Sequence, residues 1–127
     1  MSLQDKKVMI VDDSKAMIML LKRILEEGGY QVVGEIQTGE DAVIQYDKLK
    51  PDLVTMDLIL PGISGIDAIK RILGNDPKAC IVAVSSVGGT PEKLMDALKA
   101  GARNVISKPF DPEKVTKILN DVLAAHK

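Results

Sequence analysis

The sequence predicts an α/β fold in which a parallel β-sheet carries helices on both of its faces. Short apolar runs rich in β-formers alternate about five times with amphipathic segments of helical periodicity. The connections between them are short, which is typical of right-handed βαβ units. The chain has 127 residues, of which 46% are hydrophobic, enough for the core of one globular domain. We therefore expect a single domain over residues 1–127.

The expected strands are short, and several of them end abruptly at polar side chains. The apolar run from Leu53 to Met56 follows the turn residues Pro51 and Asp52 and stops at Asp57, before a proline and a glycine. The five strands are predicted at residues 7–11, 31–36, 53–56, 79–84 and 104–107. Continuous apolar runs of this length are typical of strands that are buried on both faces.

Each expected helix begins at a residue type that favours the N-cap position. These N-caps are Ser14, Thr38, Ser64, Thr90 and Asp111. Gly28-Gly29, Gly74-Asn75 and Gly101 are expected to end three of the helices. The residues predicted to face the core are Met17, Leu21, Ile24 and Leu25; Ala42, Val43 and Tyr46; Ile66, Ile69 and Leu73; and Val115, Ile118, Leu119 and Val122.

Composition argues against several classes of function. The formal net charge is −1 and no basic stripe is present, which disfavours direct binding of nucleic acid. The apolar runs are too short to span a bilayer and no signal peptide precedes the first strand, so we expect a cytoplasmic protein without membrane insertion. The single cysteine, Cys80, lies in an apolar run and is expected to be a small buried hydrophobe.

Polar residues with distinct chemistry follow four of the expected strands. They are Asp12 and Asp13, Asp57, Ser85, and Lys108. Because the carboxyl ends of parallel strands meet at one edge of the sheet, we expect these side chains to converge there. Three carboxylates form an oxygen-rich site suited to Mg²⁺. A lysine and a hydroxyl beside them could contact the outer oxygens of a phosphoryl group, and a carboxylate can be its covalent acceptor.

Taken together, these motifs resemble the receiver domain of two-component response regulators. The residues that carry the resemblance are Asp12-Asp13, Asp57, Pro61-Gly62-Ile63-Ser64-Gly65, Ser85 and Lys108-Pro109-Phe110. The match extends from about residue 7 to residue 123. It implies a flavodoxin-like fold, a three-layer α/β/α sandwich whose five-stranded parallel sheet has the strand order 2-1-3-4-5.

The resemblance also implies a site and a chemistry. Asp57 would receive a phosphoryl group from a histidine kinase, and Mg²⁺ would be held by Asp13, Asp57 and the main-chain carbonyl of Ile59, with Asp12 acting through water. Lys108 would pair with the carboxylate and then the phosphoryl group, and Ser85 would move towards the phosphoryl oxygens. The bond between Lys108 and its proline would be cis. The protein would then be a phosphoacceptor that assists its own phosphorylation and dephosphorylation, and not an enzyme.

Three positions depart from the family's usual pattern. Val105 stands where a switch aromatic is common, so a rotating ring cannot report phosphorylation. Ser86 replaces a common alanine and precedes a glycine-rich stretch at 87–89, which suggests that the loop and the fourth helix transmit the signal. Ile59 is apolar where other members often carry a polar side chain, and this predicts slow autodephosphorylation because an apolar group cannot orient water.

Several alternatives remain open at this level. The chain could be a chemotaxis-type regulator, a phosphorelay intermediate or a receiver excised from a longer regulator. A phosphorylation-independent docking module would be expected to lack the acids or the lysine, and a flavodoxin-like cofactor binder would want a glycine-rich phosphate loop after the first strand. The expected surface for a downstream protein comprises the fourth helix, fifth strand and fifth helix, including Met95, Lys99 and Val105.

Overall fold

A single parallel sheet organises the computed structural model, which describes residues 6–86 and 90–126. Its strand order is β2-β1-β3-β4-β5, and all neighbouring strands pair in parallel. The strands are β1 (Lys7–Val11), β2 (Gln31–Ile36), β3 (Leu53–Asp57), β4 (Ile81–Ser85) and β5 (Asn104–Ser107). The helices are α1 (Lys15–Glu27), α2 (Gly39–Leu49), α3 (Gly65–Asn75), α4 (Pro91–Ala100) and α5 (Pro112–Ala125).

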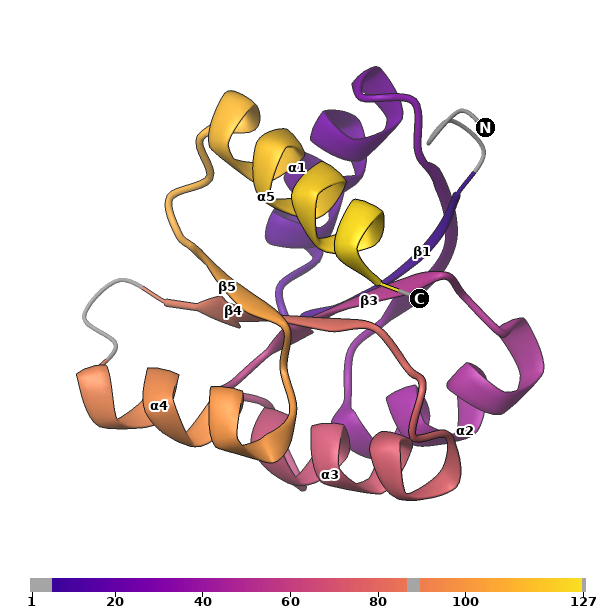
Figure 1. Ribbon diagram of the computed structural model, residues 1–127, viewed down its shortest axis with the longest axis vertical. Coiled ribbons are helices and arrows are strands. Elements are labelled where there is room, and N and C mark those ends of the chain that lie inside the picture. Colours follow the sequence, from indigo (N-terminus) through magenta and orange to yellow (C-terminus); the bar gives the residue numbers. More distant parts are fainter. Residues whose placement is uncertain (1–5, 87–89, 127) are drawn as a thin grey trace.

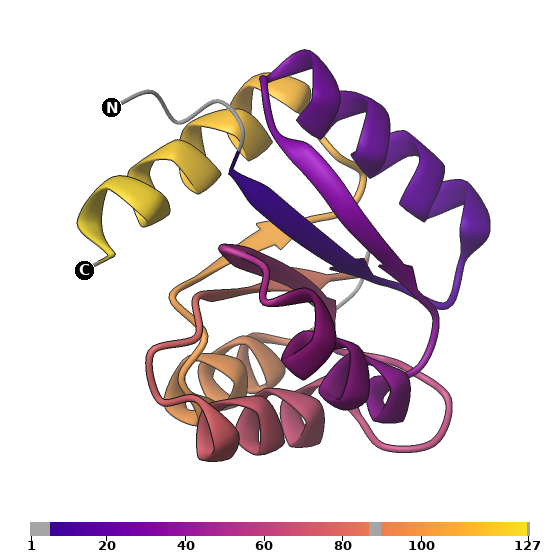
Figure 2. The same cartoon turned by 90° about the vertical axis from the view of Figure 1, so that its right-hand side faces the viewer.

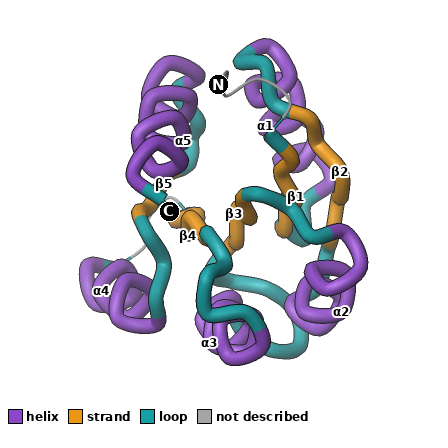
Figure 3. Tube along the Cα trace, turned by 45° about the vertical axis from the view of Figure 1, so that its right-hand side comes forward, coloured by secondary structure: helices purple, strands orange, loops and turns teal. Residues whose placement is uncertain are grey.

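The helices cover both faces of the sheet. Helices α1 and α5 lie side by side on one face, and α2, α3 and α4 lie on the other (Figure 1). The same three layers appear when the molecule is turned by 90° (Figure 2) and in the Cα tube (Figure 3). The flavodoxin-like sandwich and the strand order 2-1-3-4-5 are therefore confirmed.

Each face of the sheet has its own apolar core. Beneath α1 and α5, the buried side chains include Ile10, Val82 and Leu119. On the opposite face, Met56, Ile69 and Ile81 are buried beneath α2, α3 and α4. Neighbouring residues of one strand point to opposite faces, so both cores depend on the same central strands. Apolar burial on both faces explains why β3 and β4 read as unbroken apolar runs.

The helix starts follow the expected capping chemistry. The hydroxyls of Ser14, Thr38, Ser64 and Thr90 each accept a main-chain N–H from three residues ahead, and the Asp111 carboxylate accepts those of Glu113 and Lys114. Proline occupies the first position of α4 and of α5, where its missing N–H has no helical partner to lose.

The end of the third helix was confirmed, but one strand boundary was wrong. Helix α3 ends at Asn75, within the expected Gly74-Asn75 pair, and Pro77 disfavours helical geometry at the next residue, Asp76. Strand β4 begins at Ile81, two residues later than expected, since the Ala79 N–H still donates to the Asp76 carbonyl in the preceding turn.

Burial in α1 also differs from the expectation. Ile18 is buried, whereas Met17 is only partly covered. Four other residues that were expected to face the core are partly buried and pack against it, as predicted: Val43, Ile66, Leu73 and Ile118. The stretch at 87–89 lies outside the described residues. Within the described part of the chain, no helix combines the length and apolar composition needed to cross a membrane.

Candidate functional site

The register of the sheet brings the ends of four strands to one level. Val11 pairs with Met56, Asp57 with Val84, and Ser85 with Ser107. The residues that follow or end these strands include Asp12, Asp57, Ser85 and Lys108, so the register alone places them along the same edge. The convergence expected from the sequence is observed at this edge.

Lys108 joins the two buried carboxylates of the site. Its Nζ lies 2.8 Å from Asp12 Oδ2 and 3.0 Å from Asp57 Oδ2. Asp12 is 4% exposed and Asp57 3% exposed, so both ion pairs are shielded from water. The peptide bond that follows, Lys108-Pro109, is cis, as expected.

The loop after β3 is folded tightly against Asp57. The Ile59 N–H donates to Asp57 Oδ1 over 3.1 Å, and the Gly65 N–H donates to the Leu58 carbonyl over 3.1 Å. A Cβ at Gly65 would lie 2.0 Å from the main-chain oxygen of Asp57, so only glycine allows the first turn of α3 to approach this closely. The acceptor side chain is thus held through its own loop.

The loop after β1 is held in a similar way. Asp12 Oδ1 accepts the Ser14 N–H over 2.9 Å, and the Asp12 N–H donates to the Ile36 carbonyl over 2.9 Å. Asp13 is exposed, and its main-chain oxygen accepts a 3.2 Å hydrogen bond from Gln37 Nε2. Asp12 therefore faces the interior of the site while Asp13 forms its solvent side.

Charge within this cluster is unbalanced. Burial raises the pKa of the Asp57 carboxyl, and the nearby charge of Asp12 adds to the rise; the hydrogen bonds from Ile59 and Lys108 offset only part of it. Burial lowers the pKa of Lys108, but its ion pairs with Asp12 and Asp57 outweigh that effect and raise it overall. Lys108 therefore stays charged, and one ammonium serves two carboxylates.

The acidic cluster has the chemistry of a magnesium site. One carboxylate oxygen from each of Asp12, Asp13 and Asp57 lies within 4.8 Å of the others. With three carboxylates against the single Lys108 ammonium, the formal charge of this group is −2, which a divalent cation would neutralise. Hard carboxylate oxygens with room for water at the exposed Asp13 suit Mg²⁺. The donor set therefore fits the expected ion.

Other predicted site residues lie nearby without joining the ion pairs. The Ser85 hydroxyl is buried and donates to the Ser86 carbonyl over 3.3 Å, while the Ser85 carbonyl accepts the Lys108 N–H over 2.9 Å. The Ile59 side chain is 53% exposed beside the acceptor. The roles of Ser85 and of the Ile59 carbonyl stay predictions.

Sequence reasoning missed two residues that shape this edge. Gln37 contacts Asp13 from the end of β2, although nothing in its local sequence distinguishes it from any other loop glutamine. Gly65 appeared only as part of a motif, but it is the close approach of α3 to Asp57 that requires a glycine there. Both contacts join segments that are distant in sequence or depend on packing, so only the folded chain reveals them.

Comparisons with known proteins agree with this arrangement. The family model for the response regulator receiver domain matches residues 8–120. A chemotaxis protein CheY from Thermotoga maritima is 48% identical over 117 residues, covering 92% of this chain and 97% of the relative. CheY from Halobacterium salinarum is 42% identical over 120 residues, covering 94% of this chain and 98% of the relative.

Solved structures show the same similarity. In the crystal structure of the CheX-CheY-BeF3-Mg complex from Borrelia burgdorferi, the matching chain superposes with a TM-score of 0.88 at 31% identity. The match covers 94% of this chain and 90% of that one.

Proposed function

The chain belongs to the response regulator receiver family, and from this premise we propose that Asp57 accepts a phosphoryl group from the phosphohistidine of a histidine kinase. The observation that carries the proposal is the shared ion pair of Lys108 with Asp12 and Asp57 at the carboxyl edge of the sheet. It supports a site in which a buried carboxylate is presented beside a fixed positive charge.

In the proposed transfer, a carboxylate oxygen of Asp57 attacks phosphorus as the phosphorus–nitrogen bond of phosphohistidine breaks. The Ile59 N–H holds Oδ1 and Lys108 holds Oδ2, so the carboxylate is oriented before the donor arrives. As charge develops on the phosphoryl oxygens, the Lys108 ammonium is near enough to stabilise it. Ser85 then supplies a hydroxyl to the phosphoryl group from the adjacent strand end.

Mg²⁺ is the cofactor we propose for this site. Asp12, Asp13 and Asp57 are the side chains that would hold it, together with the main-chain carbonyl of Ile59. When bound, the ion supplies positive charge that offsets repulsion between these carboxylates and an incoming phosphoryl group. Loss of the ion would leave the excess negative charge of the cluster opposing transfer.

On this proposal the protein is a phosphoacceptor and not an enzyme that turns over a separate substrate. Water attack on the phosphoryl group restores the Asp57 carboxylate and releases inorganic phosphate. The exposed Ile59 side chain offers no hydrogen bond to orient that water, and we therefore propose slow autodephosphorylation.

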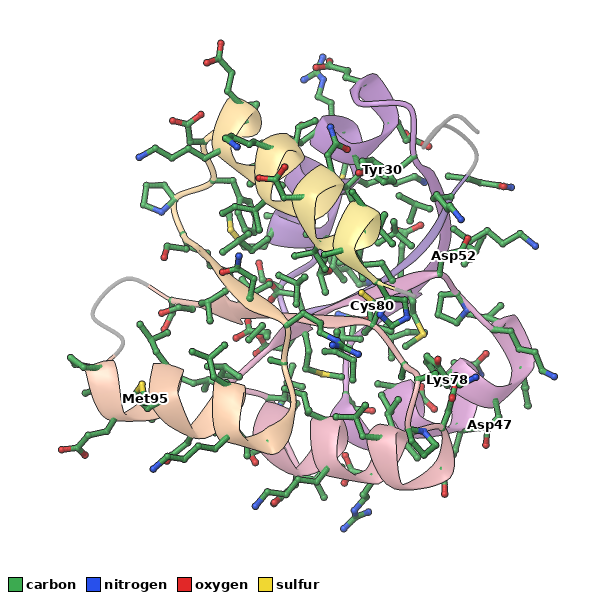
Figure 4. The ribbon with its side chains drawn as sticks, viewed as in Figure 1. Tyr30, Asp47, Asp52, Lys78, Cys80 and Met95 are labelled. Atoms are coloured by element: carbon green, nitrogen blue, oxygen red, sulfur yellow. The ribbon has the colours of Figure 1, made fainter. Side chains whose placement is uncertain are left out.

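We further propose a chemotaxis-type output through protein binding. The CheY relatives support this pathway, and the Borrelia complex shows that a structurally similar chain associates with CheX. On this chain the surface would include α4 and β5, where Met95 is exposed on α4 (Figure 4) and Val105 is partly buried. An exposed methionine is an adaptable apolar contact for a partner.

Intact mass after incubation with acetyl phosphate and Mg²⁺ tests the acceptor. We expect one added phosphoryl group, absent after chelation and absent in Asp57→Ala. Asp47→Ala is the matched control, because this exposed aspartate lies on α2, away from the strand ends that form the site (Figure 4). An adduct that persists in Asp57→Ala, or no adduct in the wild type, would reject the proposal.

The lifetime of the phosphoryl group tests the role of Ile59. In Ile59→Asn an amide can orient water, so we expect phosphate release to accelerate by about tenfold. This is less than a general acid–base group contributes, because an amide orients water without taking its proton. Ile44→Asn, another exposed isoleucine, should release phosphate at the parent's rate. Equal rates in all three proteins would contradict the proposed role of Ile59.

The response of α4 tests the proposed output surface. With beryllofluoride and Mg²⁺ standing in for the phosphoryl group, amide chemical shifts of α4 (Pro91–Ala100) should change more than those of α2 (Gly39–Leu49). The reason is that Val105 cannot carry the signal by rotating a ring, which leaves the helix to move. Shifts confined to the immediate neighbours of Asp57 would count against transmission through α4.

A further inference from the structure

The junction between β2 and α2 reaches into the candidate site. Gln37, directly after β2, donates from Nε2 to the main-chain oxygen of Asp13 over 3.2 Å. One residue earlier, the Ile36 carbonyl accepts the Asp12 N–H over 2.9 Å. Two consecutive residues of this junction therefore bind the two acids that follow β1, from 24 positions away in the chain.

An exposed glutamine can position another group only if its own main chain is held. Ile36 is buried in the core, and the Thr38 hydroxyl caps α2 by accepting the Asp41 N–H over 3.1 Å. Gly39 is buried against the loop that follows Asp57: a Cβ there would lie 2.7 Å from Ile63 Cγ1 and 3.0 Å from the Ile63 carbonyl. Gln37 thus extends from a segment that is fixed on both sides.

Asp13 is the carboxylate that most needs such support. Asp12 and Asp57 are buried and paired with Lys108, whereas Asp13 is exposed and no ion pair to it is found in the described chain. One of its carboxylate oxygens lies within 4.8 Å of an oxygen of each of the other two, and the direction of its side chain depends on the orientation of its main chain. The hydrogen bond from Gln37 to the Asp13 carbonyl restrains that peptide.

We propose that Gln37 is a positioning residue for the proposed Mg²⁺ site, acting through the main chain of Asp13. The inference rests on the proposed function, because it assigns the ion to the same three carboxylates. Hydrogen bonds around metal ligands orient those ligands and alter affinity without touching the ion. Gln37 lowers the freedom of Asp13 in the metal-free protein, so less order has to be gained when the ion binds.

The test compares Gln37→Met with wild type and with Gln31→Met. Methionine keeps the length of the side chain and removes the donor. Gln31 is an exposed glutamine at the opposite end of β2, which makes it a matched control. Mg²⁺ affinity is measured by calorimetry, amide order parameters of Asp13 and Ser14 are measured in chelator, and the urea midpoint is measured in chelator.

We expect Gln37→Met to bind Mg²⁺ about fivefold more weakly, as the loss of one ordinary hydrogen bond predicts. The Asp13 amide should become more mobile without metal, while the urea midpoint stays at that of Gln31→Met. Unchanged affinity and mobility would overturn the proposal, as would a weakened affinity explained by a general loss of stability. Failure of the wild type itself to bind Mg²⁺ would instead reject the proposed cofactor.

Discussion

At the scale of single residues, Lys108 neutralises part of the negative charge of the acidic edge. It is the only cation that forms an ion pair with Asp12 or Asp57 in the described chain, and it pairs with both. A buried carboxylate without a partner is strongly destabilising, so Lys108 supports the fold as well as the proposed chemistry. One residue thereby links the ends of β1, β3 and β5.

Lys50 is the one described non-glycine residue with a positive φ, at 46°, where it ends α2. A glycine at this position would remove about 1–2 kcal/mol of strain that the left-handed conformation costs the folded state. It would also make the unfolded chain more flexible, which lowers the free energy of unfolding by about 0.4–1 kcal/mol. We expect Lys50→Gly to raise the free energy of unfolding by about 0.5 kcal/mol, measured with urea. Lys48→Gly, inside the same helix, should lower it by about 1 kcal/mol. The same sign for both variants would contradict the strain argument.

Cys80 is 2% exposed, and burial raises the pKa of its thiol from an ordinary value near 9 to about 11. Thiolate is therefore scarce in the folded protein, and a disulfide reagent at pH 8 should react far more slowly before unfolding in urea than after it. Equal rates before and after unfolding would contradict this burial.

The sign of the pH effect on stability follows from the same shift. A raised folded pKa means that the contribution of the thiol is fully present below pH 9 and is lost as the pH rises through about 11. The difference in unfolding free energy between wild type and Cys80→Ala should therefore narrow between pH 8 and pH 11. If the difference in unfolding free energy did not change with pH, the thiol of the folded protein would be exposed to water.

At the scale of elements, the loop from β3 to α3 sets the geometry of the acceptor. Asp57 ends the strand, and Gly65 begins the helix in close contact with the Asp57 main chain. Strand end and helix start are thus packed together, which fixes the path of the intervening residues that include Ile59.

Alanine substitutions at two glycines of α3 separate packing from helix propensity. In Gly65→Ala the new Cβ would lie 2.0 Å from the Asp57 oxygen and 2.7 Å from Leu58 Cα, so the main chain must shift. We expect the free energy of unfolding of Gly65→Ala to fall by about 2 kcal/mol, as in other overpacked sites, and its phosphorylation to be slower. In Gly74→Ala no atom lies within 4 Å of the new Cβ. Because alanine favours the helix more than glycine does, the free energy of unfolding measured with urea should rise by about 0.8 kcal/mol. Equal effects would show that Gly65 is not limited by space.

At the scale of the whole molecule, one sheet separates two cores that share its strands. Tyr30 is buried on the face of α1 and α5, and Tyr46 on the face of α2 and α3. Their hydroxyls bond to Asn120 and Asp76 respectively, so each tyrosine ties a helix to a distant segment of its own face. Because the central strands contribute side chains to both cores, neither layer can lose its packing without exposing the other.

This shared sheet predicts a single cooperative unfolding transition. The chain has two tyrosines and no tryptophan, so each Tyr→Phe variant keeps a single fluorescent tyrosine. The fluorescence of Tyr30→Phe then reports unfolding around Tyr46 on one face of the sheet, and that of Tyr46→Phe reports unfolding around Tyr30 on the other. We expect each urea midpoint to coincide with that of the same variant's circular dichroism. Ile69→Ala and Leu119→Ala, buried on opposite faces, should each lower the free energy of unfolding by about 2–5 kcal/mol. Separate midpoints for the two probes within one variant would contradict the shared core.

The order and type of the elements could be predicted from the sequence. Caps such as Ser14 and Thr90, and apolar runs such as Leu53 to Met56, act through neighbouring residues, so their effect is readable locally. Strand order followed only from the family resemblance, because pairing depends on contacts between distant segments. A boundary failed at the start of β4. Ala79 and Cys80 are apolar and buried, but the Ala79 N–H belongs to the turn before the strand.

For the site, the sequence named the acids, the lysine and the serine, since parallel strands must bring their carboxyl ends to one edge. How these side chains meet depends on contacts that only the folded chain makes. It paired Lys108 with both Asp12 and Asp57, left Asp13 exposed, and placed Gln37 against Asp13. These contacts depend on strand register and on packing across the sheet, which are properties of the whole chain and cannot be read from any local stretch of it.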